Sequence, residues 1–392
     1  MYRSLLSEHK EFIESHQHDD VNALVLKYQS HALPIEWIAA QIKGRQKARY
    51  KLPLFYANKS IVFPPSLNLE QSSSEATAQF KAVWVKEIVG ETNAGIDLTG
   101  GFGIDSFFLS RNFKAWHYIE PKTELLEIVR HNFETLGIDN VSFHNETAEA
   151  FLGSQTEASF VYIDPSRRVD TRKVFTLADC DPDITTIQEE ILQHTRHLLV
   201  KTSPLHDLQE GIRLLKNVRQ VIVLSVNNEC KEVLFHLEKD YLGKPEILAI
   251  ELPSNEQFQF TFEEERQSIA AFAEVKAFLY EPNAAILKAG SFKSIGNKFG
   301  LYKLHTNTHL YTADVENTKF PGRIWHIINV VKPEKKSVAA LLSDGKANVL
   351  TRNYPLSPDQ LKKQLGVKDG GNMYLIGFTD QKKRLVIAER LK

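Results

Sequence analysis

The sequence predicts an α/β fold in which a mostly parallel sheet follows an N-terminal helical region and precedes a small α+β region. Between Ala94 and about Phe262, apolar strand candidates alternate with helical segments, which is the pattern of βαβ units. The first strand candidate runs into a glycine-rich turn, Gly100–Gly103, and helical spacing resumes directly after it. After Arg266 the pattern changes to short strands with few helices. A chain of 392 residues, 42% of them apolar, is long enough for two or three domains with substantial cores.

The composition indicates a folded chain that works in a reducing compartment. Two cysteines, Cys180 and Cys230, cannot build a disulfide framework or a four-ligand zinc site, so we expect no metal. Residues 1–20 are polar, unlike a secretory signal, and no uncharged apolar run reaches the roughly 18 residues that a membrane span needs. We therefore expect a cytoplasmic protein without a membrane partner, whose oligomeric state stays open.

Charge is distributed unevenly along the chain. The formal net charge is −1, but residues 321–392 carry 14 Lys and Arg against six Asp and Glu, a surplus of eight positive charges. Such a basic end is typical of a nucleic-acid-binding region attached to an acidic catalytic body. A solvated basic surface without that role explains the asymmetry equally well.

Residues 1–90 predict a helical N-terminal domain, because apolar residues recur at helical spacing from Leu5 to Ile42. The segment Lys51–Pro65 contains three prolines, and we expect it to be extended. A further helix is expected to end at Val89, with Ser73 or Ser74 as its N-cap.

The central region, residues 91–266, predicts the parallel sheet. A ligand would bind beyond the carboxyl ends of its strands, where the strand order reverses. The expected helices are Glu124–Leu136, Ile184–His197 and Leu208–Asn217. The expected strands are Gly95–Asp97, Trp116–Glu120, Val141–His144, Phe160–Asp164, Leu198–Lys201, Val221–Val226 and Ile247–Leu252.

The remaining residues predict a small α+β end in two parts, 267–318 and 319–392. The first part contains an expected helix, Gln267–Leu279, and the second an expected helix, Leu356–Leu365. Strands of the second part are expected at Arg323–Val331, Val349–Arg352, Asn372–Phe378 and Arg384–Glu389. Its aromatic residues could stack on bases, but their alternate spacing in strands favours a core role. They are Trp325, Tyr354, Tyr374 and Phe378.

The glycine turn and two strand-end acids form a candidate binding site. Asp97 ends the first strand candidate, and Glu120 ends the second. Counted from Gly101, the third glycine of the dinucleotide fingerprint is replaced by Ser106, and no P-loop lysine follows. What remains is a tight turn between two acids, of which Glu120 could accept hydrogen bonds from both hydroxyls of a ribose. The alternative is that the two acids only cap helices.

In these features the sequence resembles the class I S-adenosylmethionine-dependent methyltransferases, which have a Rossmann-like sheet. The motifs are DLTGGFG (Asp97–Gly103), YIE (Tyr118–Glu120), NETAEAF (Asn145–Phe151) and YIDPSRR (Tyr162–Arg168). The resemblance implies S-adenosylmethionine as the cofactor, with its ribose on Glu120. An acidic residue of the third motif commonly meets the adenine, which implies Glu146, or Thr147 if the register is shifted. The methionine and ribose part would contact Asp97, Thr99, Gly101 and Gly103.

The DPSRR segment lies where this family places the substrate end of the site. The resemblance implies that Asp164, which also borders the cofactor, and Pro165 form a rigid turn that orients or deprotonates the methyl acceptor. The segment departs from the Asn-Pro-Pro-aromatic pattern of exocyclic-nitrogen methyltransferases. It partly matches the Asp-Pro-Pro-Arg of RNA uracil-C5 enzymes, which use a cysteine nucleophile. Cys180 is a candidate for that role, although a lone cysteine is more often a small buried hydrophobe. Arg167 and Arg168 would grip phosphate or form surface salt bridges.

Over nearly its whole length the chain is similar to one bacterial group of methyltransferases with a helical N-terminus, a ferredoxin-like insert and a C-terminal THUMP-like domain. The segments LEQSSSEATAQFKA, YIDPSRR, LLVKTSP and YEPNAAILKAG carry this resemblance. It implies that Gln71 and Ser73 approach the methionine end of the cofactor, and that Lys201, Thr202 and Ser203 border the substrate pocket. Helix capping by the serine and a solvated Lys201 are the structural alternatives.

Three functions follow as hypotheses. THUMP domains belong to RNA-modifying enzymes, so the first is an S-adenosylmethionine-dependent methyltransferase that methylates RNA, with tRNA expected first, by direct displacement at the methyl group. The second is a small-molecule or protein methyltransferase. The third is a catalytically silent RNA-binding protein of methyltransferase fold.

Overall fold

The computed structural model describes residues 2–31, 33–90, 92–154, 156–167, 176–342 and 344–392. The chain divides into two compact units. The first comprises Met1–Arg219 and Val233–Gly243, and the second Gln220–Glu232 and Lys244–Lys392. No helix among the described residues is long and apolar enough to cross a membrane.

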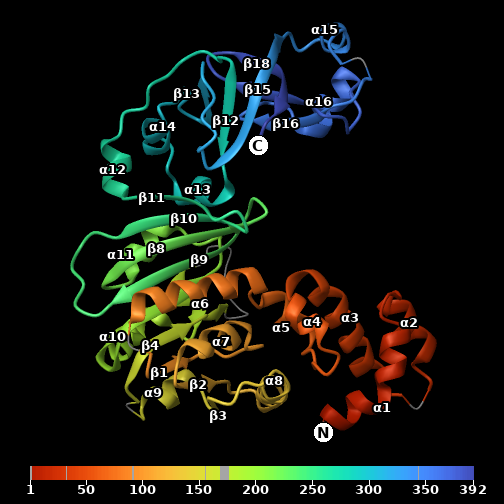
Figure 1. Ribbon diagram of the computed structural model, residues 1–392, viewed down its shortest axis with the longest axis vertical. Coiled ribbons are helices and arrows are strands. Elements are labelled where there is room, and N and C mark those ends of the chain that lie inside the picture. Colours follow the sequence, from red (N-terminus) through yellow and green to blue (C-terminus); the bar gives the residue numbers. More distant parts are fainter. Residues whose placement is uncertain (1, 32, 91, 155, 168–175, 343) are drawn as a thin grey trace. The chain divides into compact units, whose positions relative to one another are not determined.

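The first unit begins with the predicted helical region (Figure 1). Its helices are α1 (Tyr2–Ser15), α2 (Val21–Tyr28), α3 (Ile35–Lys51), α4 (Pro53–Ala57), α5 (Ser66–Gln71) and α6 (Glu75–Val89). The extended segment expected over Lys51–Pro65 is wrong in its first half, because proline suits the first position of a helix and Pro53 opens α4. Ser74, the second of the two N-cap candidates, caps α6 by accepting a hydrogen bond from the Thr77 amide at 3.2 Å.

The sheet of the first unit is the expected, mostly parallel one. Its order is β9-β7-β4-β1-β2-β3, in which all neighbours are parallel except β9, which runs antiparallel to β7. The strands are β1 (Ala94–Asp97), β2 (Ala115–Ile119), β3 (Val141–His144), β4 (Ala158–Ile163), β7 (Thr195–Thr202) and β9 (Glu229–Glu238). The chain proceeds from β1 outward to β3 on one side and from β4 to β7 on the other. The order therefore reverses between β1 and β4, which is where a ligand crevice is expected.

Short helices connect these strands, and the predicted ends of two of them need correction. The connections are α7 (Ile104–Leu109), η1 (Ser110–Asn112), α8 (Thr123–Thr135), α9 (Ala148–Leu152), β5 (Ser166–Arg167), η2 (Leu177–Asp179), β6 (Cys180–Asp181), α10 (Ile184–His194) and α11 (Leu208–Leu214). Helix α10 ends three residues before the predicted His197, because β-branched Thr195 already belongs to the buried strand β7. Helix α11 ends before the predicted Asn217, which adopts a positive φ of 57°.

The second unit contains two groups of strands. The first has the order β11-β10-β8, with β8 (Val218–Val226), β10 (Glu246–Leu252) and β11 (Glu256–Phe260). The second is a seven-stranded sheet of order β13-β14-β12-β15-β18-β17-β16. Its strands are β12 (Phe278–Pro282), β13 (Tyr302–His305), β14 (Thr308–Ala313), β15 (Gly322–Val331), β16 (Asn348–Arg352), β17 (Met373–Thr379) and β18 (Lys383–Arg390). The helices are α12 (Phe262–Gln267), α13 (Ala284–Ala289), α14 (Ser294–Phe299), α15 (Lys335–Ala339) and α16 (Pro358–Leu365).

Two sequence-based expectations for this region are corrected. The helix predicted over Gln267–Leu279 is wrong, because Thr261 and Glu264 form a capping box that starts α12 at Phe262, this helix ends at Gln267, and Phe278 already begins β12. Strand β9 was not expected. It begins at a tight turn in which Asn227 and Asn228 have φ of 52° and 62°, the left-handed conformation that two-residue hairpin turns require.

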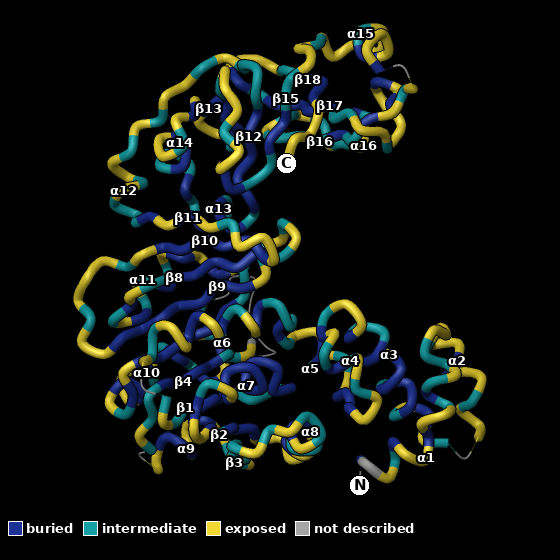
Figure 2. The backbone as a smooth tube through the Cα atoms, viewed as in Figure 1, coloured by how far each residue is buried: buried dark blue, intermediate teal, exposed yellow. Residues whose placement is uncertain are grey.

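Buried residues concentrate along the strands, as Figure 2 shows for β1 and β4. In the C-terminal sheet Trp325 and Phe378 are buried in one core, against which Tyr374 packs, and Tyr354 packs against a second core around Leu361 and Leu375. The aromatic residues of this end thus have the core role that their spacing favoured.

Asn132 of α8 hydrogen-bonds to Val62 in the extended segment that follows α4. Its side chain is buried, accepts a hydrogen bond from the Val62 amide at 2.9 Å and donates one to the Val62 carbonyl at 2.8 Å. Asn132→Ala should therefore lower the free energy of unfolding by about 2–4 kcal/mol, because two buried backbone groups lose their partners. Urea unfolding followed by circular dichroism measures this loss. The exposed Asn22→Ala should change the same quantity by less than about 0.5 kcal/mol, and equal effects of both substitutions would contradict this role of Asn132.

Candidate active site

The turn after β1 fits only glycine at two positions. A Cβ on Gly100 would lie 2.3 Å from Cζ of Tyr118, and one on Gly103, which has a φ of 72°, would lie 2.7 Å from a methyl group of Val129. The Tyr118 hydroxyl donates a hydrogen bond to the Gly101 carbonyl at 2.6 Å. The turn therefore lies directly on β2 and α8, and its position is fixed by close packing of the backbone.

Asp97, at the end of β1, holds this turn from inside. One of its carboxylate oxygens accepts a hydrogen bond from the Thr99 amide at 2.9 Å and the other from the Ser106 hydroxyl at 2.5 Å. That hydroxyl in turn accepts from the Trp116 indole N–H at 2.9 Å. Burial raises the pKa of Asp97 to about 7, because its neutral donors compensate only part of the lost hydration.

Glu120 reaches the same turn from the end of β2. Its carboxylate accepts hydrogen bonds from the amides of Gly101 at 3.0 Å and Lys122 at 2.8 Å. It is only 6% exposed, and burial raises its pKa. The strand-end acid and the glycine turn that the sequence analysis combined are thus in direct contact.

Asp164 follows β4 on the other side of β1. Its amide donates a hydrogen bond to the Thr99 hydroxyl at 2.6 Å, which ties the turn after β4 to the glycine turn. Its carboxylate lies 2.5 Å from the Lys201 ammonium near the end of β7. Burial raises the pKa of Asp164, and the charge of Lys201 opposes that shift. Residues from β1, β2, β4 and β7 therefore meet where the strand order reverses.

A buried ion cluster lies beneath this meeting point. Asp105 in α7 lies 2.9 Å from the Lys81 ammonium of α6 and 3.5 Å from that of Lys201. It also accepts hydrogen bonds from Ser73 at 2.6 Å and Tyr162 at 2.7 Å. Ser73 accepts from both lysines, at 3.0 Å and 3.1 Å. Burial alone would raise the pKa of Asp105, but the two lysines outweigh it and hold the pKa well below its ordinary value.

The sequence analysis did not find Lys81, Asp105 or Tyr162. A signal for Lys81 was present, since it lies at helical spacing from the buried Ala78 and Val85 and so belongs to the apolar face of α6. A charge at such a position indicates a buried partner, because an unpaired ammonium there is strongly unfavourable. Which partner it meets depends on the tertiary fold.

The other predicted site residues differ from one another in burial and in hydrogen-bond partners. Gln71 ends α5 and is exposed, whereas Ser73 is buried in the ion cluster and caps no helix. Glu146 is half-buried and lies 3.7 Å from His144, and Thr147 caps α9 by accepting from the Ala150 amide at 3.3 Å. The solvated alternative for Lys201 is wrong, since this residue is 6% exposed.

The segment after Asp164 is described only in part. Pro165 is half-buried in the turn after β4, and Arg167 pairs with Cys180 in the two-stranded ladder of β5 and β6. Arg168 and the side chain of Arg167 lie outside the described residues. Cys180 is buried and forms no disulfide among the described residues. The Thr202 hydroxyl donates to the Val233 carbonyl of β9, and the Ser203 hydroxyl accepts from the Leu205 amide. Among the described residues no group of His, Cys, Asp and Glu could hold a metal ion.

Comparisons with known proteins indicate which proteins this chain is similar to. Residues 278–321 match the family model of a ferredoxin-like domain, and residues 322–390 match that of a THUMP-like domain. Two relatives from Mycobacterium tuberculosis, strains CDC 1551 / Oshkosh and ATCC 25618 / H37Rv, are each named an uncharacterized S-adenosylmethionine-dependent methyltransferase. Both are 24% identical over 245 residues, which covers 62% of this chain and 65%, just under two thirds, of their own length.

A solved structure is similar over the whole chain. It belongs to a protein of Porphyromonas gingivalis W83 that is described as a presumed methyltransferase. The TM-score is 0.86 and the sequence identity 29%, with 100% of this chain and 98% of that chain covered. The fold predicted from the sequence, a methyltransferase domain that leads to ferredoxin-like and THUMP-like domains, is confirmed. The predicted enzyme class and cofactor, a methyltransferase that uses S-adenosylmethionine, agree with the names of these relatives. The domain boundaries at 90, 266 and 318 stay predictions.

Lys81→Met should destabilise the first unit by about 3–5 kcal/mol, because it breaks a buried ion pair and leaves Asp105 with one lysine fewer. The pKa of Asp105 is lower in the folded protein than in the unfolded chain. Its ion pairs therefore stabilise the fold fully at pH values above the unfolded pKa. This stabilisation is lost as the pH falls through the folded pKa. Without Lys81, burial raises that native pKa, and acid unfolding should begin at a higher pH.

Urea and acid unfolding of the variant measure both effects. The matched control is Lys86→Met, an exposed lysine of the same helix, which should leave both transitions nearly unchanged. Equal behaviour of the two variants would contradict the stabilising role of the cluster.

Proposed function

We propose that this chain transfers the methyl group of S-adenosylmethionine to RNA, and to tRNA in particular. The observation that carries the proposal is the meeting of the glycine turn, Glu120 and Asp164 where the sheet order reverses. Methyl transfer from a nucleoside sulfonium needs a group that accepts hydrogen bonds from the ribose and a group that accepts the proton of the methyl acceptor. A tight backbone turn with one such carboxylate on either side supplies both.

The residues present fit this cofactor. Gly101 has a φ of 61°, and the nearest atom to a Cβ placed on it would be the Thr99 carbonyl oxygen at 3.6 Å, so the space beside its Cα is open to a ligand, whereas Gly100 and Gly103 are packed tightly. Glu120 would accept hydrogen bonds from both ribose hydroxyls. Asp97 would act through the turn, because its carboxylate is almost fully buried and is bonded to Thr99 and Ser106. Glu146 is the proposed partner of the adenine amino group.

Asp164 would act on the methyl acceptor. The cofactor, when bound, supplies an electrophilic methyl group on a sulfonium. Asp164 would align the attacking nitrogen, oxygen or carbon and receive its proton, while Lys201 keeps the carboxylate ionised and in place. Pro165 would restrict the turn that carries this carboxylate. Arg167 and Arg168 would contact the substrate phosphates.

RNA is favoured as the acceptor by the C-terminal end of the chain. Residues 322–390 match a THUMP-like domain, and residues 321–392 carry the surplus of eight positive charges. THUMP domains are found in RNA-modifying enzymes, and a polyanion gains affinity from such a surplus through counterion release. A cytoplasmic location fits a chain with only two cysteines.

Glu120→Gln should weaken binding of S-adenosylhomocysteine at least tenfold, because a charged acceptor is replaced by an amide that presents one oxygen instead of two. Isothermal titration calorimetry measures the affinity. The exposed Glu134→Gln of α8 is the control and should bind as the native protein does. Unchanged affinity in the Glu120 variant would refute the ribose contact, and no heat with the native protein would refute the cofactor site.

Asp164→Asn should lower the rate of methyl transfer at least about 100-fold, since it removes the proton acceptor, while binding of S-adenosylhomocysteine is retained. Tritium transfer from S-adenosylmethionine to bulk tRNA, followed by nucleoside analysis, measures the rate. In the native protein kcat/KM should fall as the pH drops through the raised pKa of Asp164.

The exposed Asp139→Asn is the control and should retain full activity. Full activity of the Asp164 variant would exclude its role as a base. Binding of the cofactor without transfer to any RNA would favour the catalytically silent or non-RNA alternatives.

A further inference from the structure

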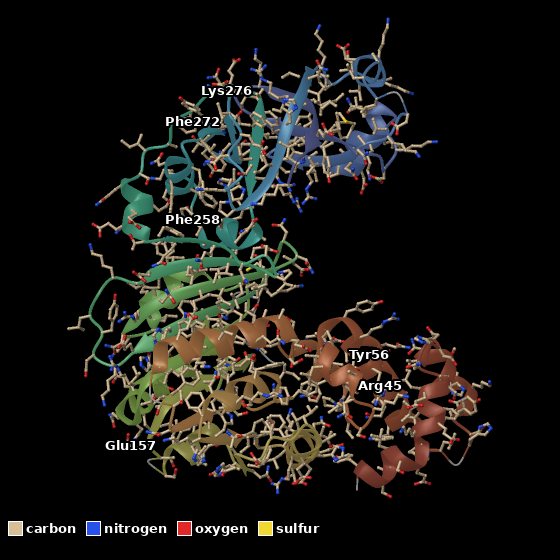
Figure 3. The ribbon with its side chains drawn as sticks, viewed as in Figure 1. Arg45, Tyr56, Glu157, Phe258, Phe272 and Lys276 are labelled. Atoms are coloured by element: carbon tan, nitrogen blue, oxygen red, sulfur yellow. The ribbon has the colours of Figure 1, made fainter. Side chains whose placement is uncertain are left out.

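A polar cavity of about 580 Å³ lies within the N-terminal helical region, away from the strand ends that form the candidate active site. One wall is the face of α3 that carries Lys43, Arg45 and Arg49. The opposite wall is the segment 17–22, which joins α1 to α2, and two tyrosines, Tyr50 and Tyr56, complete the lining. Figure 3 labels Arg45 and Tyr56 in this region. The volume is within the range of small-ligand sites.

The cavity is held open by hydrogen bonds between its walls. The side-chain amide of Gln46, on α3, donates to the carbonyls of Gln17 at 3.1 Å and Asp19 at 2.9 Å. The carboxylate of Asp20 accepts from the Ala23 amide at 2.8 Å and caps α2. The segment opposite α3 is therefore fixed in position before any ligand arrives.

Arg45 is the residue that indicates what the cavity binds. It is only 6% exposed, and its guanidinium carbon lies 5.8 Å from the Phe63 ring centroid. Among residues 2–31, 33–90 and the other described ranges, its guanidinium forms one hydrogen bond, from Nη2 to the Lys59 carbonyl at 2.6 Å. A guanidinium has five N–H donors, so most of them lack a protein acceptor. The nearby Glu14 pairs instead with Lys59 at 3.0 Å. Arg45 lines the cavity, and none of its nitrogen atoms is both buried and without a partner among the described residues, so an anion in the cavity could complete the hydrogen bonds of these donors.

The chemistry of the walls favours a nucleotide over a simple anion. Three cations on α3 suit a phosphate, whereas Asp19 and Asp20 on the opposite wall would repel one but accept hydrogen bonds from ribose hydroxyls or base amino groups. Tyr50 is 82% exposed at the cavity, and the Arg49 guanidinium lies 5.5 Å from its ring centroid. Such a pair offers a base both an aromatic face and a cation.

The charge of α3 favours a polymer over a free nucleotide. Residues 35–51 contain five Lys and Arg and one acidic residue, Glu36. Three of the five cations line the cavity, whereas Lys47 pairs with Glu70 and Lys51 donates to backbone carbonyls. The helix keeps a positive net charge, from which a continuous phosphodiester chain gains more than a mononucleotide does.

We propose that the cavity between α3 and the segment 17–22 binds a nucleotide of the RNA substrate, with its phosphate on Arg45, Lys43 and Arg49 and its base against Tyr50 or Tyr56. The inference rests on RNA being the substrate, as proposed above. It adds a second place of RNA contact, in the first unit, to the THUMP-like domain of the second.

Ultraviolet cross-linking of the full chain to bulk tRNA, with mass-spectrometric peptide mapping, tests the position directly. Cross-links are expected in the peptides that carry Tyr50 and Tyr56. Affinity is measured by filter binding at several salt concentrations. The double variant Lys43→Gln/Arg49→Gln should raise Kd at least tenfold and reduce the slope of log Kd against log salt by about 2, one for each cation removed.

The variants are chosen so that a folding defect cannot mimic the result. Lys43, Arg49 and Tyr50 are exposed, so their substitution should leave unfolding and calorimetric binding of S-adenosylhomocysteine unchanged. Arg45→Gln should give the largest single loss of affinity, and it is interpreted only together with the exposed pair. The matched control is Lys27→Gln, an exposed lysine of α2 that does not line the cavity, which should bind RNA like the native protein.

The outcomes separate this inference from the proposed function. Suppose that the native protein binds and methylates tRNA, and that the double variant binds it with the same Kd and the same slope of log Kd against log salt. The cavity assignment is then wrong and the proposed function stands. If the double variant loses RNA binding but native protein methylates no RNA, the cavity assignment stands and the proposed activity is wrong. If native protein binds no RNA, both fail. If polyglutamate at equal charge concentration displaces tRNA, the cavity binds an acidic protein, and the proposal that it binds a nucleotide is wrong.

Discussion

The ion cluster around Asp105 is the interaction on which the first unit depends. It joins side chains from helices α6 and α7, from strands β4 and β7 and from the turn before α6. Removing such charges from water costs several kcal/mol for each ion, and only a complete set of partners repays that cost. The cluster is therefore complete only when the helices and strands that supply its side chains are all in their native positions.

Two buried aspartates show how the lysines of the ion cluster change the pKa of a carboxylate. Asp97 and Asp105 lie eight residues apart and are both almost fully buried, yet their pKa values shift in opposite directions. Asp97 meets only neutral donors, so burial dominates and its pKa rises to about 7. Asp105 meets two lysines, which outweigh its burial. The hydrogen bonds of Asp97 are thus sufficient to position the turn. A buried carboxylate such as Asp105 stays charged because cations lie next to it.

Much of the site could be predicted from the sequence because its parts follow one another in simple order. Asp97, Glu120 and Asp164 each end a strand of a parallel sheet, and such ends meet at one edge whatever the details of packing. Lys81 and Asp105 could not be paired in this way, since their contact depends on how α6 lies against α7. Strand β9 was missed for a local reason, because the Asn227-Asn228 turn carries none of the glycine that usually marks a hairpin.

Lys201 connects the structural network to the chemistry proposed for Asp164. It contacts Ser73, Asp105 and Asp164, so the same ammonium that neutralises the cluster also faces the proposed base. Only the Oδ2 atom of Asp164 is engaged by Lys201, and Oδ1 has no partner among the described residues, which leaves one oxygen to orient an acceptor. Burial raises the pKa of this carboxylate and the lysine lowers it again. The balance of these two effects is what a base that must be ionised near neutral pH, yet still accept a proton, requires.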